Sequence, residues 1–150
     1  MLKYAAGIFF TLIIVIVIGV YIFLQSTLPK TKGNITLEGL SDPVEVIRDN
    51  WGVPHIFARD KKDLFYAIGY VMAQDRLFQM DFIRRVGSGR LAEILGEDLI
   101  QTDHFLRLLS VMWPEERMAE MIRGRYRDAM SAYAAGVNEF IETHPNSLPI

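Results

Sequence analysis

The chain has 150 residues, 51% of them hydrophobic and 23% charged, a composition that excludes an intrinsically disordered protein. Its formal net charge is -2 and it has no basic stripe, so the sequence gives no sign of nucleic-acid binding. It contains no cysteine, which excludes disulfides, thiolate metal sites and cysteine nucleophiles.

The first feature along the chain is an uncharged apolar run from Ala5 to Leu24. A helix of this length spans roughly 30 Å, the thickness of the hydrocarbon core of a bilayer. A cleaved signal peptide usually has an apolar region of about 7–15 residues before an A-x-A-like site, and no such site follows here. The run therefore predicts a transmembrane signal anchor at 5–24 behind a tail at 1–4. A cleaved signal peptide is the second alternative, and a buried soluble helix is the third.

Lysines lie on both sides of this apolar run, so charge specifies its orientation only weakly. The simplest arrangement leaves the short tail in the cytoplasm and places the bulk of the chain outside it. We expect a membrane-anchored protein of the cell envelope or periplasm, with secretion after signal cleavage as the alternative.

Residues 25–43 are expected to form a linker with one short strand at 34–40. Residues 44–58 then predict a β-hairpin, in which N-W-G at 50–52 forms the turn, because asparagine and glycine tolerate positive φ. The proline at position 54 favours the start of a strand. These residues open the main domain, which we expect to cover 44–150.

From Asp60 the hydrophobic period becomes helical. Asp60 can cap the helix, and Asp63 stands three residues on, similar to a capping box with aspartate in place of glutamate. Apolar residues at three- and four-residue spacings predict one helix through Arg85, which G-S-G at 87–89 ends. Further helices are expected at 89–96, 103–112 and 114–143. With the hairpin, these elements predict an α+β fold class.

The sequence predicts no catalytic, cofactor-binding or metal-binding residue in this chain. The histidines have no second ligand at a metal spacing, and no serine lies in a G-x-S-x-G or S-x-x-K motif. The G-S-G segment lacks the lysine of a phosphate loop, and the Glu97-Asp98 pair is expected to bias the start of the next helix. The histidines are His55, His104 and His144, and the serines are Ser26, Ser41, Ser88, Ser110, Ser131 and Ser147.

One polar triplet, Gln74, Asp75 and Arg76, interrupts a strongly apolar stretch of the predicted helix. Adjacent helical residues point about 100° apart, so the triplet does not share one narrow face. Asp75 falls close to the apolar stripe, and a buried carboxylate there needs a cationic partner. Candidate partners are Arg48, Arg84 and Arg107. We interpret the triplet as a structural lock; a solvated face and a catalytic role are the alternatives.

Four motifs in order carry a resemblance to a known family. They are I-R-D-x-x-G-V-P-H-I-x-A at 47–58, D-L-x-x-A-x-G-Y-V-x-A-Q-D-R-L-x-Q-M-D at 63–81, R-R-x-x-x-G-R-L-A-E-x-x-G at 84–96 and D-x-x-x-R at 103–107. Their order and spacing over residues 44–143 resemble the start of the penicillin acylase (penicillin amidase) family.

The resemblance implies an N-terminal-nucleophile hydrolase with a four-layer αββα core. In such enzymes a precursor cleaves itself, and the new N-terminal serine of the β chain attacks an amide carbonyl with its own α-amine as base. The resemblance also implies a structural calcium in the full-length parent, no cofactor in this chain, and substrates that are small acylated amides such as penicillins, cephalosporin-type compounds and acyl-homoserine lactones.

The chain departs from the family because it ends inside the α-chain region. The nucleophilic serine and the cleavage junction are expected downstream, in a β-chain region that would be the partner of this part. We therefore expect an incomplete αββα fold and a fragment that is inactive alone. The alternative is a free-standing membrane-anchored helical interaction module.

Overall fold

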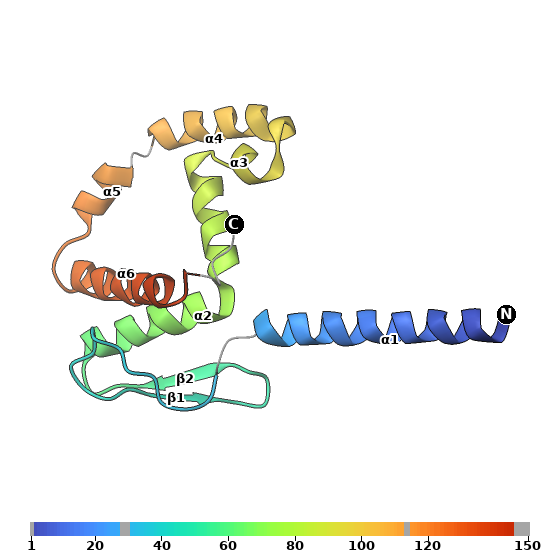
Figure 1. The fold of residues 1–150 in the computed structure, drawn as a ribbon. Coiled ribbons are helices and arrows are strands. Elements are labelled where there is room, and N and C mark those ends of the chain that lie inside the picture. Colours follow the sequence, from blue (N-terminus) through green and yellow to red (C-terminus); the bar gives the residue numbers. More distant parts are fainter. Residues whose placement is uncertain (1, 28–30, 113–114, 146–150) are drawn as a thin grey trace. The chain divides into compact units, whose positions relative to one another are not determined.

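A computed structural model describes residues 2–27, 31–112 and 115–145 of the chain. It divides into two units, Met1–Asn34 and Ile35–Ile150. The first unit contains one helix, α1 (Leu2–Thr27), and the second contains all the other elements (Figure 1).

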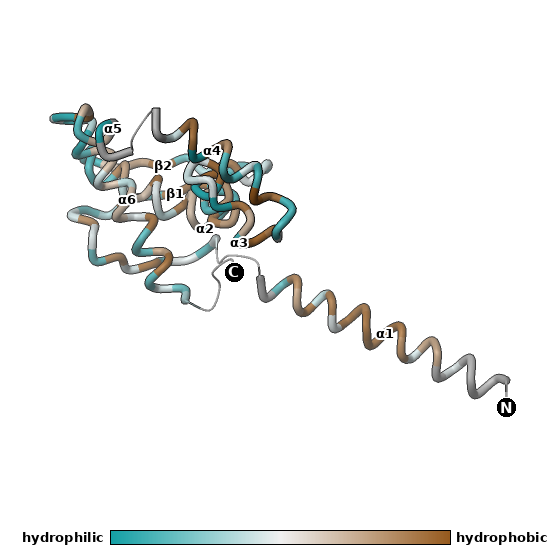
Figure 2. The backbone as a smooth tube through the Cα atoms, turned by 90° about the horizontal axis from the view of Figure 1, so that it is seen from above, coloured by the Kyte–Doolittle hydropathy of each residue, from teal (hydrophilic) through white to brown (hydrophobic). Residues whose placement is uncertain are grey.

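The predicted transmembrane helix is not supported. The helix itself forms where the sequence predicts one, and apolar residues follow one another along most of α1 (Figure 2). Yet among the helices of the described residues, none is both long enough and apolar enough to cross a membrane.

The second unit is mostly helical, so the predicted α+β class is wrong. The αββα layers are likewise not present in the described residues, whose one sheet has two strands. Its elements in chain order are β1 (Glu45–Arg48), β2 (Pro54–Phe57), α2 (Lys61–Ser88), α3 (Ala92–Leu95), the 3-10 helix η1 (Glu97–Leu99), α4 (Ile100–Met112), α5 (Glu115–Met121) and α6 (Arg125–Thr143).

Two other expected elements differ in the structure. Residues 34–40 form no strand; they include a turn at residues 38–39 and do not pair with the hairpin. The single helix expected at 114–143 is divided into α5 and α6. Gly124 lies between them with φ of 60°, a left-handed conformation that glycine adopts without a steric penalty.

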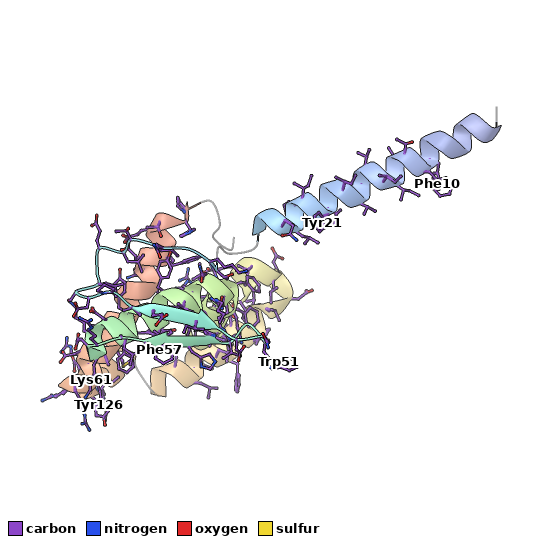
Figure 3. All side chains as sticks on the ribbon, turned by 90° about the horizontal axis from the view of Figure 1, so that it is seen from below. Phe10, Tyr21, Trp51, Phe57, Lys61 and Tyr126 are labelled. Atoms are coloured by element: carbon purple, nitrogen blue, oxygen red, sulfur yellow. The ribbon has the colours of Figure 1, made fainter. Side chains whose placement is uncertain are left out.

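The β-hairpin is confirmed. Strands β1 and β2 are antiparallel, with Glu45 opposite Phe57 and Arg48 opposite Pro54. The Asp49 carboxylate organises the connecting loop by accepting hydrogen bonds from the amides of Trp51 and Val53, each at 2.9 Å. These bonds, chiefly the one from Val53, hold the pKa of Asp49 below its usual value. Trp51 itself lies at the end of the hairpin and is 90% exposed (Figure 3).

The core of the unit lies where α2 and α6 pack side by side (Figure 1). A Cβ on Gly69 would clash with the backbone oxygen of Tyr133, and a Cβ on Gly136 would clash with the backbone oxygen of Tyr66. The two helices therefore meet backbone to backbone. Beside this contact Tyr70 and Phe140 pack edge to face, with ring centroids 5.5 Å apart.

Helix α2 is not the straight helix that its hydrophobic pattern predicts. Arg76 has φ of -151° and ψ of 33°, which are not helical values, and the helix kinks there. Figure 1 shows the two halves running in different directions. All the buried residues of α2 belong to the first half, from Asp63 to Ala73.

We predict that Gly136→Ala destabilises the chain by about 3 kcal/mol, because the new methyl group would force apart two backbones that cannot yield locally. Gly87→Ala is the matched control. Its Cβ would meet nothing within 4 Å, so it should be neutral or stabilise the helix by about 0.5–1 kcal/mol. Urea unfolding of both variants measures this, and equal stabilities would contradict the close approach of the helices.

Candidate functional site

The polar triplet of α2 binds the β-hairpin through Arg48. The Arg48 guanidinium donates to both carboxylate oxygens of Asp75, at 2.8 and 2.9 Å, and to Oε1 of Gln74 at 3.0 Å. The same guanidinium donates to the Gly52 carbonyl oxygen in the hairpin loop at 3.1 Å. We call this set of four residues the Arg48 clasp. It ties the hairpin loop to α2 immediately before the kink.

The clasp is partly buried, with the side chains of Arg48 and Asp75 16% and 21% exposed. The planar fork of arginine matches the two carboxylate oxygens, which makes this pair stronger than a single-contact ion pair. Of the three predicted partners for Asp75, the structure selects Arg48. Arg84 pairs with Asp81 instead, and Arg107 donates to the Gly89 carbonyl oxygen.

Asp63 is fully buried, and it makes a second polar contact with distant backbone. Its two oxygens accept hydrogen bonds from the amides of Ser41 and Asp42, at 3.0 and 2.9 Å. These bonds, led by the one from Ser41, lower the pKa of Asp63. The predicted capping box is thus only half formed. Asp60 caps the helix by accepting from the Lys62 amide, whereas Asp63 holds the segment before the hairpin.

Asp103 makes the same kind of contact at the other end of α2. It is 3% exposed and accepts hydrogen bonds from the amides of Leu91 and Ala92, both at 2.8 Å. Arg107, one turn on, donates to the Gly89 carbonyl oxygen at 2.9 Å. The D-x-x-x-R motif therefore binds the loop that follows α2. Sequence reasoning found the motif but missed this role, since the spacing of one helical turn was its only local signal.

An ion-pair chain covers the surface of this loop. Asp81 accepts from Arg84 at 2.6 Å and from Arg85 at 2.7 Å, and Arg85 also donates to Glu93 at 2.7 Å. Hydrogen bonds from the guanidinium groups, first that of Arg85, lower the pKa of Asp81. Those from Arg90 lower the pKa of Glu93. These ion pairs join the second half of α2 to α3.

The histidines lie apart from one another. Nε2 of His55 is 3.4 Å from the Asp49 carboxylate on the exposed hairpin. His104 is exposed on α4. His144 stacks on Phe140 at 4.4 Å between ring centroids. Within the described part of the chain, no group of three histidine or acidic residues could hold a metal ion.

Two serine hydroxyls on helices bond to the backbone of their own helix. Ser88 donates to the Arg84 carbonyl oxygen at 2.8 Å, and Ser110 donates to that of Arg107 at 2.9 Å. Ser147 lies outside the described residues. The G-S-G helix stop is confirmed, since Gly89 ends α2 with φ of 60° and its amide donates to the Arg85 and Val86 carbonyl oxygens. The Glu97-Asp98 pair forms η1, directly before α4.

These contacts share one chemistry: charged side chains bind backbone amides, backbone carbonyls or each other. A reacting group would need a nucleophile and a base in mutual reach, and the contacts described above bring no such pair together. They define a helical scaffold segment in which polar side chains hold distant parts of the backbone together.

Comparison with known proteins identifies the family to which this scaffold belongs. A family model described as Penicillin amidase matches residues 43–150, and the chain belongs to that family. Residues 44–143, over which the sequence motifs resemble this family, lie within the match.

Relatives in the family are named acylases. The chain is 44% identical over 118 residues to the Penicillin acylase 2 proenzyme of Pseudomonas sp. (strain SE83). This aligned region covers 79% of this chain and 15% of that protein. It is 40% identical over 116 residues to Penicillin G acylase of Escherichia coli, and the aligned region covers 74% of this chain and 14% of that protein. It is 34% identical over 125 residues to Acyl-homoserine lactone acylase QuiP of Pseudomonas fluorescens (strain Pf0-1), covering 83% and 15%.

A solved structure supports the fold. The thermostable penicillin G acylase from Alcaligenes faecalis aligns with a TM-score of 0.62 and 38% identity, over 71% of this chain and 58% of that chain. The chain thus spans only 14–15% of the length of the curated relatives reported above, but more than half of the solved chain.

We predict that Asp75→Ala lowers the free energy of unfolding by about 2 kcal/mol, because it removes two charge-assisted hydrogen bonds and leaves a partly buried guanidinium without its carboxylate partner. Arg48→Ala should cost a similar amount. In the double variant the two losses should fall well short of additive. Asp98→Ala, at an exposed carboxylate of η1, should change stability by less than about 0.5 kcal/mol. Additive losses in urea unfolding would show that the pair is not coupled.

We predict that stability declines as the pH falls below about 4, and that Asp63 contributes to this decline. Its pKa is lowered in the folded state, so its stabilisation is present above its unfolded-state pKa and is lost as pH falls through the folded-state value. Asp63→Asn should therefore be less stable at neutral pH and decline less steeply in acid. Thermal unfolding from pH 7 to 2 measures this. Asp98→Asn should follow the wild-type curve, and an Asp63→Asn curve parallel to wild type would contradict the assignment.

Proposed function

We propose that residues 1–150 are the N-terminal part of an amidohydrolase that cleaves the amide bond of small acylated substrates. The observation that carries this proposal is the family match over residues 43–150, together with 44% identity to a protein named as a penicillin acylase proenzyme. Acylases of this type hydrolyse amide carbon–nitrogen bonds. In such an enzyme this chain supplies scaffold, since Asp63, Asp103 and Arg107 bind distant backbone groups and the Arg48 clasp ties the hairpin to α2.

The nucleophile of the proposed enzyme lies outside this chain. We propose an N-terminal serine, exposed when the precursor cleaves itself, whose own α-amine acts as base. The proenzyme name of one relative supports processing. So does the difference in coverage, because the chain covers 58% of the solved acylase chain but 15% of the proenzyme. The region beyond residue 150 is then the partner of this one.

The names of the relatives indicate two kinds of substrate. Two relatives are named as penicillin acylases and a third as an acyl-homoserine lactone acylase. We propose a small acylated amide of one of these two kinds. The penicillin type is favoured because those relatives have the higher identities, 44% and 40% against 34%.

We propose that the full-length enzyme binds a calcium ion, as the family resemblance implies. Among the described residues, no group of three histidine or acidic side chains could act as its ligands. We also propose that the protein works outside the cytoplasm after export. The uncharged apolar run at 5–24 within α1, with lysines before and after it in the sequence, supports this. N-terminal sequencing of the exported protein would establish its processing.

We predict no amide hydrolysis by the 150-residue chain alone, and turnover by the full precursor after it has divided into two chains. Suitable probes are a phenylacetyl amide with a chromogenic amine and an N-acyl-homoserine lactone. Ser88→Ala and Ser110→Ala in the full precursor should leave turnover unchanged, because both hydroxyls bond to helix backbone. Turnover by the chain alone, or a processed precursor inactive on both probes, would refute the proposal.

A further inference from the structure

The kink in α2 has no cause in its own sequence. Sharp kinks usually occur at proline, at glycine–serine pairs, at π-bulges or where another group enters the helical hydrogen-bond ladder. Residues 70–86 contain no proline, glycine or serine. Residues with ordinary helical propensity surround Arg76, and the hydrophobic pattern predicts a single helix. A tertiary contact must therefore select the bent form.

The Arg48 clasp is the tertiary contact at that point. It binds Gln74 and Asp75, the two residues immediately before the non-helical Arg76. The guanidinium thus brings a positive charge to the C-terminal end of the first half of α2, where the helix dipole favours a cation. Its bond to the Gly52 carbonyl oxygen fixes that charge to the hairpin loop.

The segment beyond the kink is internally braced. Asp103 and Arg107 hold the loop after α2, and Asp81, Arg85 and Glu93 join α2 to α3. We call residues 77–112 the arm. No residue in the α2 part of the arm is buried, and Phe78 and Ile83 are each 61% exposed. Leu77, directly after the kink, packs partly buried against the core cluster, but no residue of α2 beyond it is buried. This one contact does not account for the bend.

We propose that α2 is a two-state element, bent or straight at Arg76, and that the Arg48 clasp selects the bent state. Release of the clasp lets the helical hydrogen-bond ladder continue through Arg76. The arm and its exposed apolar side chains then turn as one body relative to the α2–α6 core. The device rests on the hairpin, which positions the arginine, and is independent of the proposed catalytic function.

Spin labels on the intact 150-residue chain test this directly, because it has no cysteine to remove. Labels at Lys61→Cys and Gly87→Cys, both exposed sites, report the length of α2. A straight helix separates these residues by about 39 Å at 1.5 Å per residue, and the bent form is shorter. Arg48→Ala and Asp75→Ala should each lengthen the distance measured by electron–electron double resonance towards that value.

Matched controls separate a released bend from a lost fold. A second pair, Lys61→Cys with Glu142→Cys, spans the α2–α6 contact and should keep its distance in Arg48→Ala. Arg84→Ala, which removes an exposed arginine from the arm, should leave the Lys61–Gly87 distance unchanged. If Arg48→Ala does not fold, Arg48→Lys should show both short and long distances, since lysine keeps the charge but not the fork. An unchanged Lys61–Gly87 distance in the folded variant, or a changed Lys61–Glu142 distance, would overturn the proposal.

Discussion

The backbone-to-backbone contact between α2 and α6 is the constraint on which the rest of the second unit depends. Gly69 and Gly136 each remove a side chain where the other helix's carbonyl oxygen must fit. This close approach brings Tyr70 and Phe140 together and encloses Ala73 between the helices. Small residues at both positions therefore decide the spacing of the pair, and the aromatic residues fill the space that remains.

Polar side chains then fix the loops that do not pack against the α2–α6 pair. Asp63 and Asp103 each accept two consecutive backbone amides, so each satisfies groups that would be costly to bury without partners. The Arg48 clasp does the same for the hairpin loop through a carbonyl oxygen. Loops before and after α2 are thereby fixed by single side chains, without a large apolar core beneath them.

Sequence reasoning succeeded where the signal is local. The hairpin, the Asp60 cap and the G-S-G stop depend on residues within a few positions of each other. Arg48 was among the partners predicted for Asp75 because a carboxylate near an apolar stripe needs a cation. The failures depend on distant contacts. The kink at Arg76 lies beside the contact with Arg48 of the hairpin. Asp63 accepts hydrogen bonds from backbone amides of an earlier segment instead of completing the capping box. The predicted membrane span relied on hydropathy and length alone. The α+β class relied on one short hairpin beside the predicted helices, and the αββα layers were implied only by resemblance.

The glycine contact also sets an order of events during synthesis. Gly69 and Gly136 are separated by almost half of the chain, so the contact that closes the core is a long-range one. Such contacts carry a loop-closure cost before they give any stabilisation, which slows folding. As the chain leaves the ribosome, α2, α3 and α4 emerge before α6 is available to cover the first half of α2. The apolar residues of that half, Tyr70 and Val71 among them, must therefore remain exposed to solvent until synthesis has passed Gly136.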